Sequence, residues 1–199
     1  MVLITLLAVA LAGSAWWATN VLSNAPQRAQ LAYEAGMAKL GPADFRGAIA
    51  KFTESIEIRE TAMAYLERGN AHNNLGEAQQ ALADWNQALR IDPNLAAAYT
   101  ARGTYRRVSG DLPRALADLD RSLQIAPSVD AYYQRGQVKH TMGDYQQAVS
   151  DYSDAIALRR EAPYVYLARS VSKKSLGDDA GAREDWNTAA GLQVSDRDR

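Results

Sequence analysis

A period of 33 to 34 residues constrains the fold of this chain more than any other feature of its sequence. Four glycines and one serine set the register of this period, and we call them the landmarks. They follow one another at spacings of 33, 34, 33 and 34 residues: Gly36, Gly69, Gly103, Gly136 and Ser170. A period of this length is typical of arrays in which each unit buries its apolar face against its neighbours.

Further positions recur around each landmark, with side-chain sizes that suit packed helices. Seven residues after it lies a residue suited to a tight turn: Ala43, Gly76, Gly110, Gly143 and Gly177. Twelve after it lies alanine, at 48, 81, 115, 148 and 182, and sixteen after it a large side chain: Phe52, Trp85, Leu119, Tyr152 and Trp186. Large and small residues at helical spacing let helices interlock, so each copy is predicted to form two helices joined at the turn.

These positions, in stretches such as AYLERGNAHNNLGEAQQALADWNQALRIDP and AYYQRGQVKHTMGDYQQAVSDYSDAIAL, resemble the tetratricopeptide repeat (TPR) family over about residues 29 to 196. The resemblance implies an all-α fold, a right-handed superhelical solenoid of about five TPR helical hairpins. The predicted repeats cover residues 29–61, 62–95, 96–128, 129–162 and 163–196. The end copies depart from the pattern, with Ala32 and Ala43 replacing an aromatic residue and a turn glycine, and Ser170 as the last landmark.

A pair of opposite charges recurs in copies two to five. Arginine precedes the landmark and aspartate follows it by fifteen residues, which gives the pairs Arg68 and Asp84, Arg102 and Asp118, Arg135 and Asp151, and Arg169 and Asp185. The first copy lacks both members, with Ala35 and Lys51 in their places. The two positions face each other in an antiparallel hairpin, so we predict four structural ion pairs that set its register. The alternative is pairs of solvated charges that contribute little.

In the TPR architecture the first helix of each hairpin lines a concave surface, and one stripe of that helix is predicted to form a partner-binding groove. The predicted groove residues are Tyr33, Met37, Met63, Leu66, Asn70, Asn73, Thr100, Thr104, Arg107, Tyr133, Gln137, His140, Tyr164, Leu167 and Lys174. Their mixture of apolar and amide side chains suits a protein or peptide segment, although about half are expected to pack between repeats. Relatives that grip a C-terminal carboxylate carry lysine and asparagine at set positions of this stripe. Only Asn70 matches, which argues against that binding mode.

Composition and motifs argue against other classes of function. The formal net charge of −1 gives no field that would attract nucleic acid, and there are no cysteines to bind metal or act as nucleophiles. The two histidines, His72 and His140, lack the partners of a metal site. No catalytic motif occurs, so we predict no enzyme activity, catalytic residue, metal, cofactor or small-molecule substrate.

Residues 1–22 are mostly apolar. The run from Val2 to Leu22 contains no charged side chain and is long enough to cross a bilayer. Trp16 and Trp17 near its end favour a transmembrane anchor, while the small residues from Gly13 leave a cleaved signal sequence as the alternative. A linker is predicted at 23–28 and a polar tail at 197–199. The predicted localisation is the cell membrane, single-pass, with the C-terminal domain cytoplasmic and the periplasmic or extracellular side left open.

The leading hypothesis is a membrane-anchored scaffold or adaptor that binds a protein segment in its groove and aids the assembly or stability of a membrane protein complex. Two alternatives remain at this point. One is a permanent structural subunit of such a complex, and the other is a secreted or periplasmic TPR binding module if the N-terminus is cleaved.

Overall fold

The structure, a computed structural model, describes residues 24–197, and this part of the chain is built from ten helices and no strands. In chain order they are α2 (Ala25–Leu40), α3 (Phe45–Ile58), α4 (Ala62–Asn74), α5 (Ala78–Ile91), α6 (Ala96–Val108), α7 (Leu112–Ile125), α8 (Val129–Met142), α9 (Tyr145–Leu158), α10 (Pro163–Ser175) and α11 (Asp179–Arg197). The all-α prediction is therefore confirmed for the described residues.

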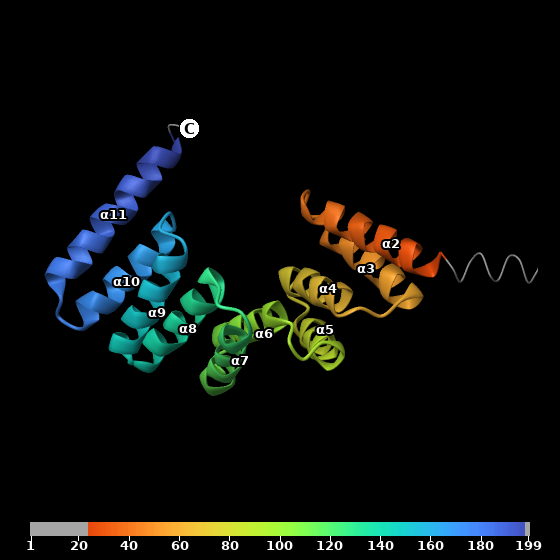
Figure 1. The fold of residues 1–199 in the computed structure, drawn as a ribbon, viewed down its shortest axis with the longest axis horizontal. Helices are drawn as coiled ribbons and strands as arrows, with labels where there is room; N and C mark the ends of the chain where they lie inside the picture. Colours follow the sequence, from red (N-terminus) through yellow and green to blue (C-terminus); the bar gives the residue numbers. More distant parts are fainter. Residues whose placement is uncertain (1–23, 198–199) are drawn as a thin grey trace, which may run out of the picture. The chain divides into compact units, whose positions relative to one another are not determined.

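The helices pair into five hairpins, each made of a first helix (α2, α4, α6, α8, α10) and the second helix that follows it (Figure 1). The turn inside every hairpin has one residue in the left-handed region. The four glycines there have φ between 74° and 88°, and Ala43 in the first hairpin has a φ of 59°. Glycine has no Cβ and accepts this conformation readily, whereas alanine is strained in it.

The chain divides after Asp92 into two compact units, which we call unit 1 (residues up to 92) and unit 2 (residues from 93). Within each unit, neighbouring first helices contact one another: α2 with α4, α6 with α8, and α8 with α10. Among the described residues, no second helix touches another second helix of its unit. Each unit therefore curves with its first helices on the inner side. The right-handed superhelix of the whole array stays a prediction.

The first four hairpins close where the large side chain sixteen residues after the landmark packs on the landmark itself. A Cβ added at Gly136 would lie 2.6 Å from the nearest atom of the Tyr152 ring, and one added at Gly69 would lie 2.8 Å from Trp85. The large side chains of the first four copies are at most 1% exposed: Phe52, Trp85, Leu119 and Tyr152. The lack of a side chain at the landmark thus creates the space for the core.

The fifth hairpin breaks this pattern. Trp186, predicted to interlock like its four counterparts, is 58% exposed. Its landmark is Ser170, which has a Cβ where the others have none, and the Ser170 hydroxyl donates to the backbone oxygen of Ala182 at 2.8 Å. The two departures occur in the same copy: the landmark has a side chain, and the tryptophan ring lies largely in solvent.

The N-terminal boundary differs from the predicted linker. Helix α2 begins at Ala25, and Pro26 occupies its first turn. Proline is tolerated there because the first backbone N–H groups of a helix have no partner within the helix. Most of the segment 23–28 is therefore helical.

The predicted single-pass membrane localisation is contradicted by the described residues. None of the helices in residues 24–197 is long and apolar enough to cross a membrane. The second helices bury alanine and large residues on one face and expose charged side chains on the other, as in α3 and α5. The predicted cell-membrane localisation, with its cytoplasmic C-terminal domain, is therefore wrong for the described residues. The predicted anchor itself, residues 1–22, lies outside the described residues.

Candidate functional site

The recurring arginines and aspartates meet in the structure, inside each of the last four hairpins. In each pair the arginine Nε and Nη2 donate to the two carboxylate oxygens of the aspartate. The distances are 2.8 and 2.7 Å for Arg68 and Asp84, 2.9 and 2.7 Å for Arg102 and Asp118, 2.9 and 2.6 Å for Arg135 and Asp151, and 2.8 and 2.6 Å for Arg169 and Asp185. The four aspartates are buried. Two-pronged pairs of this kind fix orientation as well as charge.

A second basic residue approaches each aspartate, and this feature was missed by the sequence analysis. It lies three residues after the landmark. Arg106 is 2.7 Å from Asp118, Lys139 is 2.9 Å from Asp151, Lys173 is 3.0 Å from Asp185, and His72 is 3.9 Å from Asp84. The signal was present, because in copies two to five a basic residue occupies this position and lies four residues after the paired arginine, on the same helix face.

The arginines also reach the preceding hairpin. Nη1 of Arg68 donates to Thr53 at 3.1 Å, Nη1 of Arg135 to Asp120 at 2.8 Å, and Nη1 of Arg169 to Ser153 at 3.0 Å. Each arginine of the four pairs lies over the ring of the tyrosine three residues before it, at 5.3 to 5.7 Å. In the three copies just named, one side chain therefore joins the two helices of its own hairpin and the hairpin before it.

The electrostatics of these clusters favour the charged forms of both partners. Burial alone would raise the pKa of the Asp185 carboxyl, but hydrogen bonds from Arg169 and Lys173 outweigh it and lower that pKa. Burial likewise opposes the charge of Arg135, yet its bonds to Asp151 and Asp120 raise its pKa. Among the described residues no buried side-chain nitrogen or oxygen lacks a hydrogen-bond partner, so these buried charges are engaged in contacts that join the helices.

The predicted groove residues divide into three groups by exposure. Leu66 and Thr100 are buried, and Thr100 shares a hydrogen bond of 2.7 Å with Ser122. Eight are half-buried: Tyr33, Asn70, Thr104, Arg107, Tyr133, Gln137, His140 and Leu167. Five are exposed: Met37, Met63, Asn73, Tyr164 and Lys174.

Some half-buried members are engaged within the protein. Asn70 accepts a hydrogen bond from the Trp85 indole at 3.1 Å, and Arg107 donates to Gln134 at 3.0 Å. His140 Nδ1 shares a hydrogen bond of 2.9 Å with the Ser172 hydroxyl. These side chains hold neighbouring helices together, which reduces the surface available to a partner.

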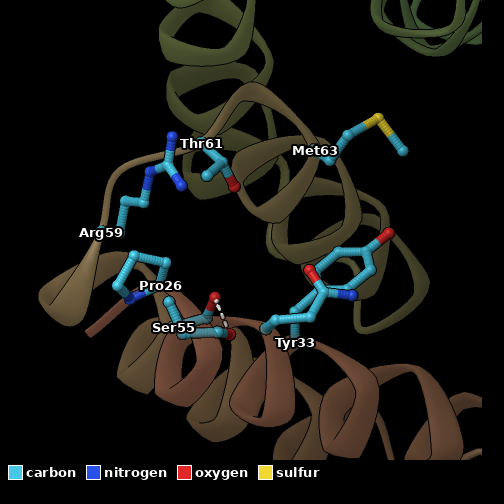
Figure 2. A pocket seen from close by; sticks show the side chains of 8 residues that line it. Pro26, Tyr33, Ser55, Arg59, Thr61 and Met63 are labelled. Carbon is cyan, nitrogen blue, oxygen red and sulfur yellow. Dashed lines mark hydrogen bonds between the residues drawn. The ribbon is translucent and has the colours of Figure 1, made fainter. Parts of the chain in front are cut away.

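Unit 1 contains a pocket of about 340 Å³ between the start of α2, the end of α3 and the start of α4. Figure 2 shows its lining, which consists of Pro26, Ala29, Gln30, Tyr33, Ser55, Arg59, Thr61 and Met63. Its volume is within the range of pockets that hold ligand groups. Tyr33 and Met63 belong to the predicted groove, whereas Ser55, Arg59 and Thr61 were not predicted, since the pocket forms only where two hairpins meet.

Polar groups of this pocket differ in whether they are already hydrogen-bonded. The Ser55 hydroxyl donates to the backbone oxygen of Ala29 at 2.8 Å, and the Thr61 hydroxyl accepts from the backbone N–H of Ala64 at 3.2 Å. The Tyr33 ring packs at 5.6 Å from Phe52. Burial, with the nearby charge of Glu67, raises the pKa of Tyr33, so its hydroxyl remains a donor at neutral pH.

Aromatic rings pack against one another at the equivalent place in unit 2. Tyr133, the counterpart of Tyr33, packs edge-on against Tyr164 at 5.0 Å and lies 6.0 Å from Tyr152. Burial raises the pKa of Tyr164; the charge of Arg159 opposes this shift and that of Asp130 adds to it. The inner face of unit 2 is therefore aromatic, with charges of both signs beside it.

Comparisons with known proteins agree with this geometry. The family model described as tetratricopeptide repeat matches residues 62–95, and a second model of the same description matches residues 129–161. No curated protein matches the sequence.

Solved structures share the fold at low sequence identity. MamA from Desulfovibrio magneticus RS-1 is 20% identical, with a TM-score of 0.73 over 84% of this chain and 96% of that chain. PilF of Pseudomonas aeruginosa is 16% identical, with a TM-score of 0.78 over 85% and 78%. PilW, described as a widely conserved type IV pilus biogenesis factor, is 17% identical, with a TM-score of 0.77 over 83% and 78%. At 16 to 20% sequence identity, this similarity shows a shared fold alone.

Proposed function

The chain is a tetratricopeptide repeat protein, and from that premise we propose that it acts as a scaffold or adaptor. It binds a segment of another protein on the inner helices of its units and thereby aids the assembly or stability of a multisubunit complex. The family matches and the fold support a protein-interaction scaffold. The groove, the partner segment and the role in assembly are the proposal.

The observation that carries the proposal is the apolar surface left on the inner helices after the repeats have stacked. Met37, Met63 and Tyr164 are between 40% and 44% exposed, and a pocket opens next to Met63. Flexible methionines and aromatic rings of this kind are common where a surface adapts to a bound segment. Support for a role in assembly comes from PilW, a pilus biogenesis factor that uses the same fold.

Photo-crosslinking in intact cells tests this function. A photoreactive amino acid is placed at Met63 or Tyr164 on the inner helices, and in matched controls at Gln80 or Gln147, which are exposed on the second helices α5 and α9. We expect the inner positions to capture one defined protein and the outer positions to capture none of it. Equal capture from both faces, or no capture from the inner positions, would contradict the proposal.

A second candidate function is that of a permanent structural subunit, and exposed Trp186 favours it. Val171 and Leu176 of the same hairpin are 55% and 44% exposed, so an assembly that covered this hairpin would bury several large apolar side chains. Copurification at fixed stoichiometry in high salt, lost in a Trp186→Ala variant, would favour the subunit. Capture that is transient and sensitive to salt would favour the adaptor.

A further inference from the structure

The unit 1 pocket has hydrogen-bond donors that no described residue uses. Ser55 and Thr61 are committed to backbone groups, and the Gln30 amide donates to Glu34 at 2.9 Å. The Arg59 guanidinium and the Tyr33 hydroxyl, in contrast, make no hydrogen bond within residues 24–197. A ligand that fits these groups must therefore accept hydrogen bonds.

The charge of the pocket points to an anionic acceptor. Arg59 is the one charged side chain among the eight lining residues. The nearest acidic neighbour in sequence, Glu60, is engaged, because its carboxylate accepts the Tyr65 hydroxyl at 2.8 Å. Glu67, which lies near Tyr33, accepts the Asn70 amide at 3.2 Å. Neither carboxylate forms an ion pair with Arg59 among the described residues, which leaves the Arg59 charge available to a ligand.

The apolar lining of the pocket indicates which chemical group lies beside the anionic group of the ligand. Pro26, Ala29 and Met63 offer apolar surface, and Figure 2 shows Met63 and Tyr33 on one side of the opening with Arg59 on the other. An apolar side chain can fill the space between them while a neighbouring carboxylate reaches the guanidinium. A carboxylate is the acceptor whose geometry matches the two-pronged arginine fork.

Unit 2 provides an internal comparison. Arg159 lies one hundred positions after Arg59 and, like it, caps the end of a second helix. Here Asp130 stands where unit 1 has neutral Gln30, and Tyr164 stands near the place of Met63. Asp130 acts on the same Tyr164 hydroxyl as Arg159 and with opposite sign. Near the cation, unit 2 therefore carries an acidic side chain at the position where unit 1 carries a neutral one.

We propose that the unit 1 pocket binds an acidic partner segment, in which an apolar side chain enters the pocket and an Asp or Glu within two residues of it pairs with Arg59. This inference rests on the proposed function and names the chemistry of its partner. We expect the corresponding place in unit 2, beside Arg159, not to bind a carboxylate of the partner. The mode differs from capture of a C-terminal carboxylate by the inner helices, since Arg59 lies in the connection between two hairpins.

Selection from a displayed library of random ten-residue peptides on the full chain identifies a probe. We expect enriched peptides to carry Leu, Ile, Phe or Met within two residues of Asp or Glu. Enrichment of apolar peptides without acidic residues would overturn this inference and leave the proposed function standing. If no peptide is enriched, both are overturned.

The affinity of the best peptide is then compared with that of its amide form, Asp→Asn or Glu→Gln, by fluorescence anisotropy. We expect Arg59→Gln to weaken the acidic peptide about five- to tenfold, as for a lost charge-assisted hydrogen bond, and to leave the amide peptide within about twofold. The matched control, Arg159→Gln, should leave both peptides within about twofold. Because Arg59 is exposed and unpaired, its substitution should not unfold unit 1. Equal effects of the two substitutions, or equal affinity for the two peptides, would overturn the proposal.

Two other occupants give distinct results. If removal of residues 1–23 raises the affinity for the acidic peptide more than about tenfold, the chain's own N-terminal segment competes for the pocket, and the proposal is overturned. If sedimentation shows a dimer that Arg59→Gln dissociates, the occupant is a second copy, and the proposal is likewise overturned. Unchanged affinity after the deletion and a monomer in sedimentation would support the partner segment.

Discussion

Replacement of Arg135 by methionine should destabilise unit 2 by about 3 kcal/mol. Arg135 donates to Asp151 at 2.9 and 2.6 Å and to Asp120 at 2.8 Å, and Asp151 is only 2% exposed. Removal of one partner of a buried ion pair costs about 3 to 5 kcal/mol because the other charge stays buried. Lys139 remains 2.9 Å from Asp151, which places the expected loss at the lower end. Methionine keeps the apolar stem that packs over the Tyr132 ring.

The free energy of unfolding is measured by urea titration, with hydrogen exchange read over residues 129–158. This local measurement is needed because the chain has two compact units, which need not unfold in one step. The double variant Arg135→Met with Asp151→Asn should lose about 2 kcal/mol less than the sum of the single changes, since it removes the buried carboxylate that Arg135→Met alone leaves without its arginine.

An exposed pair in the same unit serves as the matched control. Arg114 lies 3.3 Å from Asp111, and its side chain is 75% exposed. Arg114→Met should change the free energy of unfolding by less than about 0.5 kcal/mol. A loss below about 1 kcal/mol for Arg135→Met, or strict additivity in the double variant, would refute the reasoning that these pairs hold the hairpins together.

Three further changes test other parts of the structure. Gly136→Ala should cost about 1 to 3 kcal/mol in urea unfolding because its Cβ would meet the buried Tyr152 ring at 2.6 Å, whereas Gly191→Ala, with open space around it, should be neutral or stabilising. Ala43→Gly should stabilise unit 1 by about 0.5 to 1 kcal/mol, seen as a higher melting temperature, because it relieves a φ of 59°. The lowered pKa of Asp185 means that its ion pair contributes fully above about pH 4 and is lost as the pH falls through the folded-state pKa. Acid unfolding followed by circular dichroism should therefore be shallower in Asp185→Asn, and an unchanged acid profile would contradict this assignment.

The repeat pattern was sufficient to predict the hairpins, the turn residues and the positions that face each other within a hairpin. Arg68 and Asp84 lie on opposite sides of the turn at Gly76, so local spacing alone placed them together. The second basic residue near each aspartate could also have been found, because His72 follows Arg68 by four residues, one helical turn.

Contacts between hairpins were not predictable in the same way. Arg169 reaches back to Ser153, and Leu66, predicted to line the groove, is 2% exposed. Both outcomes depend on the angle at which successive hairpins stack, which the spacing of residues within one copy does not specify. Ser170 was recognised as an unusual landmark, but the exposure of Trp186 in the same copy was not predicted.

The sequence by itself determined a stack of two-helix hairpins with a charged pair in four of them, because a period of 33 to 34 residues and helical spacing leave little choice of local structure. Only the tertiary structure decided which side chains remain available to a partner. It formed the pocket at Tyr33, Arg59 and Met63 from three segments that meet where two hairpins join. Exposure and unused hydrogen-bond donors are properties of packed neighbours, and neighbours are set by the stacking of the helices.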